Sequence, residues 1–507
     1  MLLLMKKNGI DINMTYANDK SCANIIGVIA DTIREHTAAK VSSAQYMSFI
    51  IDGDTDVSVK ECEIVYVRIL VDGQPTNILV GHVEVEHASA DGIYAATKSA
   101  FAGLGESCQD WLQKTVAMGA DGAAVNLGRK GGVAAKLQEE AGKHIIPFHC
   151  MPHRLELALL FAQKDSPCIG NVYNLLHLVW KTYHFSCKSR RELKSLGVEL
   201  GVSVNNPSGV RGTRWLPHVS RSLDVLLKPE KKEGTLDDAG QYTVVHAHMD
   251  HLAASSTNAD IAGRAKKVKE TMEDGSFLAF CHFLADLFTA ISKYSLLLQR
   301  NDVILPQAVS SLENLILTIE AMAVRPCHGG RLASFHAAMK RQRGAREQEQ
   351  EEEQEEGIRP EFKYRLQLDC ISLRNGCDCA LAEEEFQALK TLVFRSFKDK
   401  SYKGLRDILL MKEPYCSDFK NILHLVRIML VLPVSSAQCE RGFSIQKHIK
   451  SDIRSALNPN TVEDLIRISV EGPPLETFDA SVSVKRWMEE GQRARRPNFK
   501  SWPQDIV

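Results

Sequence analysis

The sequence has no uninterrupted apolar run that approaches the roughly 20 residues a helix needs to cross a bilayer. Its apolar start, Met1 to Met5, is too short for the core of a signal peptide, and Lys6 and Lys7 follow at once. We therefore expect an intracellular protein that has no membrane partner.

The chain also lacks a large net charge and an even number of cysteines. Its 62 lysines and arginines balance 63 aspartates and glutamates, for a formal net charge of -1. A dedicated DNA binder is usually basic, so any contact with nucleic acid must use local patches. The 13 cysteines come without a secretory signal, and we expect free thiols. The 507 residues suffice for one large domain with an insertion, or for roughly two to four ordinary domains.

The first 45 residues lack the Cys/Cys/His/His pattern of a zinc finger. Apolar residues, among them Ile29 and Ile33, recur instead at helical spacing between Ala23 and His36. The sequence therefore predicts an N-terminal helical segment.

Strand patterns begin at Tyr46. Three apolar runs of strand composition cover residues 46–52, 63–71 and 75–85. The dipeptide Asp72-Gly73 predicts a tight hairpin between the second run and the third. The following patterns predict a helix over 90–104, a strand over 115–118, a helix over 125–141 and a strand over 145–149. This is the order of an RNase H-like mixed sheet, so we expect an α/β fold, and the leading meander argues against a plain doubly wound domain.

Two aspartates stand at the ends of predicted strands. Asp52 closes the first strand with Asp54 and Asp56 close behind it, and Asp121 follows the fourth strand and precedes Gly122. Carboxylates beside glycine at strand ends leave room for a metal ion and a phosphate to approach the backbone. The alternative is that both aspartates are turn residues, because Asp-Gly pairs are common in turns.

Cys150 and His153 have a spacing that can place two ligands on one zinc ion. The alternative is a strand-to-helix turn whose polar side chains pack and form hydrogen bonds. No second obvious pair of ligands stands nearby in the sequence, so we do not expect zinc.

From residue 155 to about residue 430 the patterns are helical. This block contains the pair Arg214-Trp215, which can hold a phosphate and stack on a base. A lone tryptophan in a helical region is more often part of the core. The Glu/Gln-rich run over residues 346–357 is either a helix extension or a solvated linker, and we expect an exposed linker.

The most distinctive stretch runs from Leu432 to Ser444 and reads LPVSSAQCERGFS. Ser435 and Ser436 are candidate N-caps, and Glu440 lies about one turn inside the helix, beside an apolar face. Glu440 is therefore either an exposed helix residue or a partly buried acid that needs a cation or a hydrogen bond.

This stretch and residues 458–468, NPNTVEDLIRI, resemble the C-terminal block of the hAT transposase superfamily. The resemblance implies that Asp52, Asp121 and Glu440 are catalytic acids, which hold two Mg²⁺ or Mn²⁺ ions for cleaving and joining DNA. It is closest to animal host proteins derived from such elements.

The same resemblance implies that Arg214 and Trp215 contact DNA near the cleavage point. It also places Cys150 and His153 in the family's Cys-x-x-His motif, where an all-helical insertion begins. Many hAT proteins carry a zinc finger near the N-terminus, and residues 1–45 show none.

The resulting organisation has five segments. They are an N-terminal helical segment (1–45), the first part of an RNase H-like core (46–154), a helical insertion (155–430), a hAT C-terminal dimerisation region (431–470) and a tail (471–507). We expect a nuclear protein derived from a transposase that forms a homodimer or higher homo-oligomer and associates with DNA. The alternatives are an active DDE-type transposase and a protein-interaction scaffold that does not bind DNA.

Overall fold

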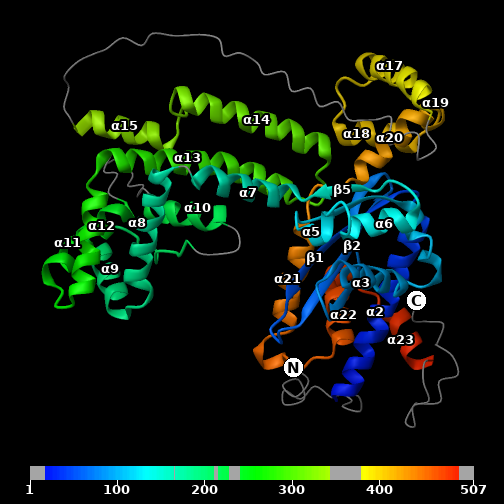
Figure 1. Cartoon of the computed structure of the whole chain (residues 1–507), viewed down its shortest axis with the longest axis horizontal. Coiled ribbons are helices and arrows are strands. Elements are labelled where there is room, and N and C mark those ends of the chain that lie inside the picture. Colours follow the sequence, from blue (N-terminus) through cyan, green and yellow to red (C-terminus); the bar gives the residue numbers. More distant parts are fainter. Residues whose placement is uncertain (1–17, 165, 211–214, 228–239, 343–377, 490–507) are drawn as a thin grey trace. The chain divides into compact units, whose positions relative to one another are not determined.

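The computed structural model describes residues 18–164, 166–210, 215–227, 240–342 and 378–489. The chain divides into two compact units. The first, here named the sheet unit, comprises Met1–Met151, Gln299–Leu305 and Tyr364–Val507, and the second, the helical unit, comprises Pro152–Leu298 and Pro306–Lys363. The sheet unit is therefore assembled from three separate parts of the chain (Figure 1).

The sheet unit contains one five-stranded mixed sheet with the order β3-β2-β1-β4-β5. Its strands are β1 (Met47–Thr55), β2 (Glu61–Val71), β3 (Gln74–Val85), β4 (Thr115–Ala120) and β5 (Ile146–His149). The first three strands form an antiparallel meander, whereas β4 pairs in parallel with both β1 and β5. The predicted α/β fold with a mixed sheet is therefore confirmed.

The turn between β2 and β3 is the hairpin that Asp72-Gly73 predicted. These two residues have positive φ angles of 49° and 71°, and Val71 pairs with Gln74 across the turn. Two central residues in the left-handed region give a turn whose twist matches that of the strands. The turn therefore sets the register of β3 against β2.

One face of the sheet is covered by α2 (Asp19–Ser43), α3 (Ala90–Ala102) and α6 (Val133–Ala141). Alternate residues of the strands point into this core, among them Phe49, Ile51 and Val65. Trp111 stacks on Phe101 with 4.1 Å between the ring centroids. This face of the sheet is therefore fully apolar at its centre.

The opposite face is covered by two helices from near the end of the chain, α21 (Ala437–Ile449) and α22 (Pro459–Glu471). Four side chains of these helices pack against four side chains of β1, β2 and β3. They are Cys439, Phe443, Val462 and Ile466 on the helices, and Ile50, Ile64, Tyr66 and Leu79 on the strands. The apolar face of α22 is therefore buried within this chain.

α22 also closes the outer edge of β3, the edge strand of the described sheet. Arg467 donates hydrogen bonds to the carbonyl oxygens of Leu79 (3.2 Å) and Val80 (2.7 Å). Glu471 accepts the N–H of Leu79 at 2.7 Å. Side chains of α22 therefore satisfy backbone groups that a neighbouring strand would otherwise use.

The four described helices that come directly before α21 in the chain also belong to the sheet unit. They are α17 (Cys379–Ser396), α18 (Tyr402–Met411), α19 (Tyr415–Asp418) and α20 (Lys420–Val431). Their core includes Leu409, Leu423 and Leu430, and Leu70 of β2 packs against it. The sequence predicted these helices as part of the insertion over 155–430. Helical periodicity shows which face of a helix is apolar, but it does not show which unit that face packs on.

The remaining short elements of the sheet unit are η1 (Glu106–Cys108), α4 (Trp111–Lys114), α5 (Ala124–Leu127), η2 (Asp452–Arg454), η3 (Leu475–Thr477) and α23 (Ser481–Glu489). The described residues of the helical unit contain α7 (Met151–Lys164), α8 (Pro167–His184), α9 (Cys187–Leu200), α10 (Trp215–Leu226), α11 (Gln241–Ser255), α12 (Ala259–Met272), α13 (Gly275–Leu298), α14 (Leu305–Val324) and α15 (Arg331–Gln342), with no strand among them.

One described helix, α13, is long and apolar enough to cross a membrane by length and composition alone. The sequence predicted a helix over 284–298 but no membrane span, because charged residues such as Asp286 and Lys293 interrupt the apolar runs. Its Asp286 accepts the backbone N–H groups of Arg331 and Leu332 at 2.8 Å and 3.0 Å. Leu284 and Phe288 of the same helix are buried. These contacts pack one side of α13 against other helices of the helical unit.

Candidate active site

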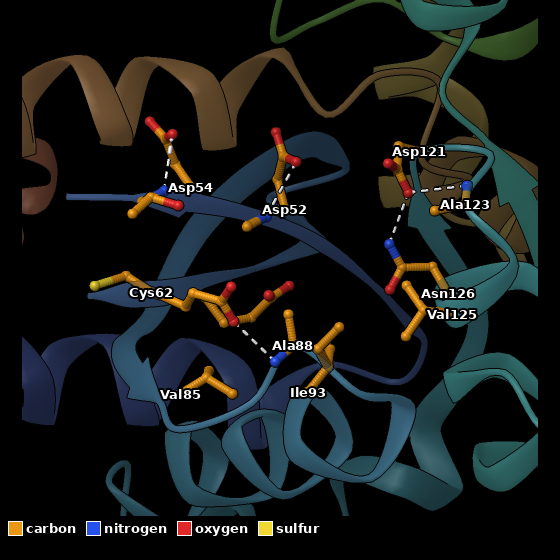
Figure 2. A pocket seen from close by; sticks show the side chains of 14 residues that line it. Asp52, Asp54, Cys62, Val85, Ala88, Ile93, Asp121, Ala123, Val125 and Asn126 are labelled. Carbon is orange, nitrogen blue, oxygen red and sulfur yellow. Dashed lines mark hydrogen bonds between the residues drawn. The ribbon is translucent and has the colours of Figure 1, made fainter. Parts of the chain in front are cut away.

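The parallel pairing of β1 and β4 brings Asp52 and Asp121 to the same end of the sheet. Ile50 pairs with Gly119, so the two aspartates, each two residues further along, lie level with each other. Both line one cavity of about 230 Å³ (Figure 2). The structure therefore brings together two of the three acids that the sequence singled out.

Local hydrogen bonds orient both aspartates. The Oδ1 atom of Asp121 accepts the backbone N–H of Ala123 at 3.2 Å and the side-chain amide of Asn126 at 2.7 Å. The Oδ1 atom of Asp52 accepts the N–H of Gly53 at 3.1 Å. Asp121 therefore serves as a turn residue and lines the cavity as well.

Glu63 is a further acid of this cavity, and the sequence did not single it out. It lies on β2 opposite Gly53, and its side chain is only 4 % exposed. A Cβ atom at Gly53 would lie 3.1 Å from Glu63 Oε2, so glycine makes room for the carboxyl group. Burial, together with the negative charges of Asp52 and Asp121, raises the pKa of Glu63 to about 8. The only sequence signal is an acid at the start of an apolar strand.

Glu440 lies in the first turn of α21, which packs against β1 and β2. The thiol of the neighbouring Cys439 is 3.8 Å from the carbonyl oxygen of Ile50, on the face toward which Asp52 points by strand alternation. Glu440 does not line the cavity that Asp52 and Asp121 share. Within the described ranges, no three His, Cys, Asp or Glu side chains are grouped closely enough to hold one metal ion.

Lys447 of α21 and Lys450, the residue that follows this helix, pair with the acids that follow Asp52 on and after β1. Lys447 lies 2.7 Å from Asp54, and Lys450 forms a buried ion pair with Asp56. Burial acts to raise the pKa of Asp56, but hydrogen bonds from Lys450 and from two backbone N–H groups outweigh it and lower the pKa. Both acids therefore fasten α21 alongside β1.

Cys150 has a structural role at the end of β5. Its buried thiol accepts hydrogen bonds from the backbone N–H and the hydroxyl of Ser436, at 3.3 Å and 3.2 Å. The next residue, Met151, donates its N–H to the carbonyl oxygen of Val434 at 3.1 Å. Cys150 and Met151 therefore join the end of β5 to the stretch before α21 within the sheet unit, and His153 follows in α7.

Two predicted features fall outside the described residues. Arg214 and the side chain of Trp215 lie there, although Trp215 begins α10. The Glu/Gln-rich run over 346–357 also lies there. The structure therefore leaves the predicted DNA contacts and the predicted linker as predictions.

One comparison with known protein families bears on the C-terminal part of the chain. Residues 393–469 match the hAT family C-terminal dimerisation region. The match runs from α17 to α22, contains Glu440, and starts earlier than the predicted boundary at residue 431. It supports a hAT transposase-like protein that carries a dimerisation region.

Proposed function

We propose that this protein is a hAT transposase-derived nuclear protein that dimerises and associates with DNA through an RNase H-like core. The observation that carries the proposal is the level placement of Asp52 and Asp121 on parallel strands, in a sheet covered by helices of the hAT match. The strand order, an antiparallel meander continued by two parallel strands, supports the RNase H-like core.

Asp52 and Asp121 offer the carboxylate oxygens that Mg²⁺ and Mn²⁺ prefer, so their chemistry fits a divalent ion. Glu440 is the third ligand that the hAT resemblance implies. When bound, such an ion activates a water or hydroxyl group and stabilises the leaving oxygen of phosphoryl transfer. The protein's own part is to orient these acids. Asn126 holds Asp121, and the lysine pairs of α21 hold the helix of Glu440 along β1.

Titration of Mn²⁺ into the full chain tests the metal site. We expect Asp121→Asn to weaken binding by about tenfold or more, since a charged ligand is lost. Asp72→Asn is the matched control, because it removes the same charge from an exposed hairpin and should leave the affinity unchanged. Equal affinities of wild type and Asp121→Asn would contradict the proposed site.

DNA association has its own test. Binding of a fluorescent duplex should weaken steeply between about 50 and 200 mM salt, because phosphate contacts release counterions. Absence of binding at low salt would favour the interaction scaffold. Nicking of DNA by wild type but not by Glu440→Gln would favour an active DDE-type transposase. The presence of Asp52, Asp121 and Glu440 in the sequence is the observation that favours this alternative.

A further inference from the structure

The cavity below Asp52 and Asp121 contains a buried acid that has no hydrogen-bond partner among the described residues. Glu63 is 4 % exposed and lines the cavity. No hydrogen bond or ion pair among the described residues includes its carboxyl group. Strand alternation directs Glu63 to the α3 side of the sheet, opposite to Asp52. Glu63 therefore belongs to a part of the cavity that the proposed catalytic acids do not occupy.

Asn126 supplies a second buried acceptor in the same cavity. Its side chain is 8 % exposed, and its amide nitrogen donates to Asp121, which fixes the orientation of the amide. The Oδ1 atom then has no hydrogen-bond partner in the described structure. Figure 2 shows this oxygen turned away from Asp121.

The chemistry of the lining determines what can fill the cavity. Its polar side chains are mainly acceptors, and neither lysine nor arginine is among the lining residues. Buried acceptors without donors are costly, and a carboxylate costs most. The complementary ligand therefore carries positive charge and donates hydrogen bonds.

The size of the cavity distinguishes a bare ion from a hydrated one. A volume of about 230 Å³ has room for roughly seven water molecules at about 30 Å³ each. No three acidic, His or Cys side chains of the described structure converge on one ion. Mg²⁺ commonly keeps several waters and binds through one or two carboxylates. An ion with its water shell therefore fits better than a directly coordinated one.

We propose that this cavity is a second cation site, in which Glu63 and the Oδ1 atom of Asn126 hold a hydrated divalent cation through its water shell. It shares the cavity with Asp52 and Asp121 but lies on the α3 side of the sheet, to which strand alternation directs Glu63, and it does not depend on DNA cleavage or dimerisation. Ile93 and Val85 close the cavity on the α3 side and limit what can enter.

Cobalt(III) hexammine tests the site, because this ion has the shape of hydrated Mg²⁺ and binds only through its outer shell. Calorimetric titration of the full chain at a pH above 8, where the Glu63 carboxyl group is ionised, should show hexammine binding that Glu63→Gln weakens by about tenfold or more. Asp72→Asn, which removes a charge from the exposed β2–β3 hairpin, is the control and should leave hexammine binding unchanged. Equal affinities of wild type and Glu63→Gln would overturn the proposal.

A second measurement guards against a variant that fails to fold. Crystals of the wild-type chain soaked in cobalt hexammine should give an anomalous peak between Glu63 and Asn126, and a soaked crystal without that peak would overturn the site. Mn²⁺ titration separates the two metal proposals. Weaker Mn²⁺ binding in Glu440→Gln with unchanged hexammine binding in Glu63→Gln would support the proposed function and overturn this inference.

Discussion

At the scale of single residues, the burial of Glu63 makes the free energy of unfolding depend on pH. Glu63 is buried beside two other acids, and its pKa is about 8 instead of the ordinary 4.5. Between these two values the folded chain binds a proton that the unfolded chain has released. The unfolded state then binds fewer protons, so the free energy of unfolding falls as the pH rises through this window.

We therefore predict that Glu63→Gln removes this pH dependence. Between about pH 4.5 and 8, wild type should lose up to about 5 kcal/mol of stability relative to the variant, and the difference should level off above pH 8. Denaturant unfolding at several pH values, with a chelator present to exclude bound cations, measures the effect. Parallel stability profiles of the two proteins would rule it out.

Residue spacing was enough to find Asp52 and Asp121, because strand ends and Asp-Gly pairs are local features. It was not enough to find Glu63. A single acid in an apolar strand reads the same in sequence whether it meets water, a lysine or an enclosed cavity. The difference comes from Gly53 on the neighbouring strand and from the loop after β4, and the sequence does not state these contacts.

At the scale of elements, α21 is fastened to β1 by two ion pairs of unequal burial. The side chains of Lys450 and Asp56 are 5 % and 3 % exposed, whereas those of Lys447 and Asp54 are 60 % and 35 % exposed. Removing one partner of a buried pair leaves an uncompensated charge, but an exposed pair contributes little.

Lys450→Met should therefore lower the free energy of unfolding by about 3–5 kcal/mol. The same change at Lys447 is the matched control and should cost less than about 1 kcal/mol. Chemical denaturation of both variants measures the difference. If the two variants were equally stable, the buried pair would not be what holds α21 on β1.

Glycine at position 442 allows the close approach of α21 to β2. A Cβ atom there would lie 2.3 Å from Cδ1 of Ile64 and 3.2 Å from the hydroxyl oxygen of Tyr66, both in the core. We expect Gly442→Ala to destabilise the chain by about 1–3 kcal/mol. At Gly263 in α12, a Cβ atom would have no neighbouring atom of the described residues within 4 Å, so Gly263→Ala should instead stabilise the chain by about 0.5–1 kcal/mol. Thermal unfolding would contradict the packing argument if both changes had the same sign.

At the scale of the whole molecule, the question is which surface joins two copies. The apolar face of α22 is used within the chain. An apolar cavity of about 510 Å³ lies instead among α17, α18 and α20, and most of its lining residues belong to the hAT match. Phe394, on its rim, is 76 % exposed. Exposed apolar surface of this kind is typical of a protein interface.

Phe394→Glu should therefore weaken the proposed dimer, because a charge would have to be buried in the interface. Light scattering is expected to give the mass of a dimer for wild type and of a monomer for the variant. Phe161→Glu, an equally exposed phenylalanine outside the match, should leave the mass unchanged. If the Phe394→Glu protein were still a dimer, the dimer interface would not include this cavity.

The order of the sheet along the chain was predictable, because each strand and the hairpin have local patterns. The packing of distant segments was not. Motif resemblance placed Glu440 and the last helices with the sheet, whereas α17 to α20 have no motif that separates them from the helices of the insertion. Their place is decided by contacts such as Leu70 with the cluster around Leu423.

Because the sheet unit is built from separate segments of the chain, its parts are translated at different times. Strands β1 to β5 leave the ribosome first, but the helices that cover Ile50, Ile64 and Tyr66 begin only at Ala437. At about 5–20 residues per second, translation of the intervening chain takes roughly 15–60 s. During that time one apolar face of the sheet and the edge of β3 are uncovered. We therefore expect the nascent sheet unit to need chaperones until its last helices emerge, by which time the whole helical unit has been translated.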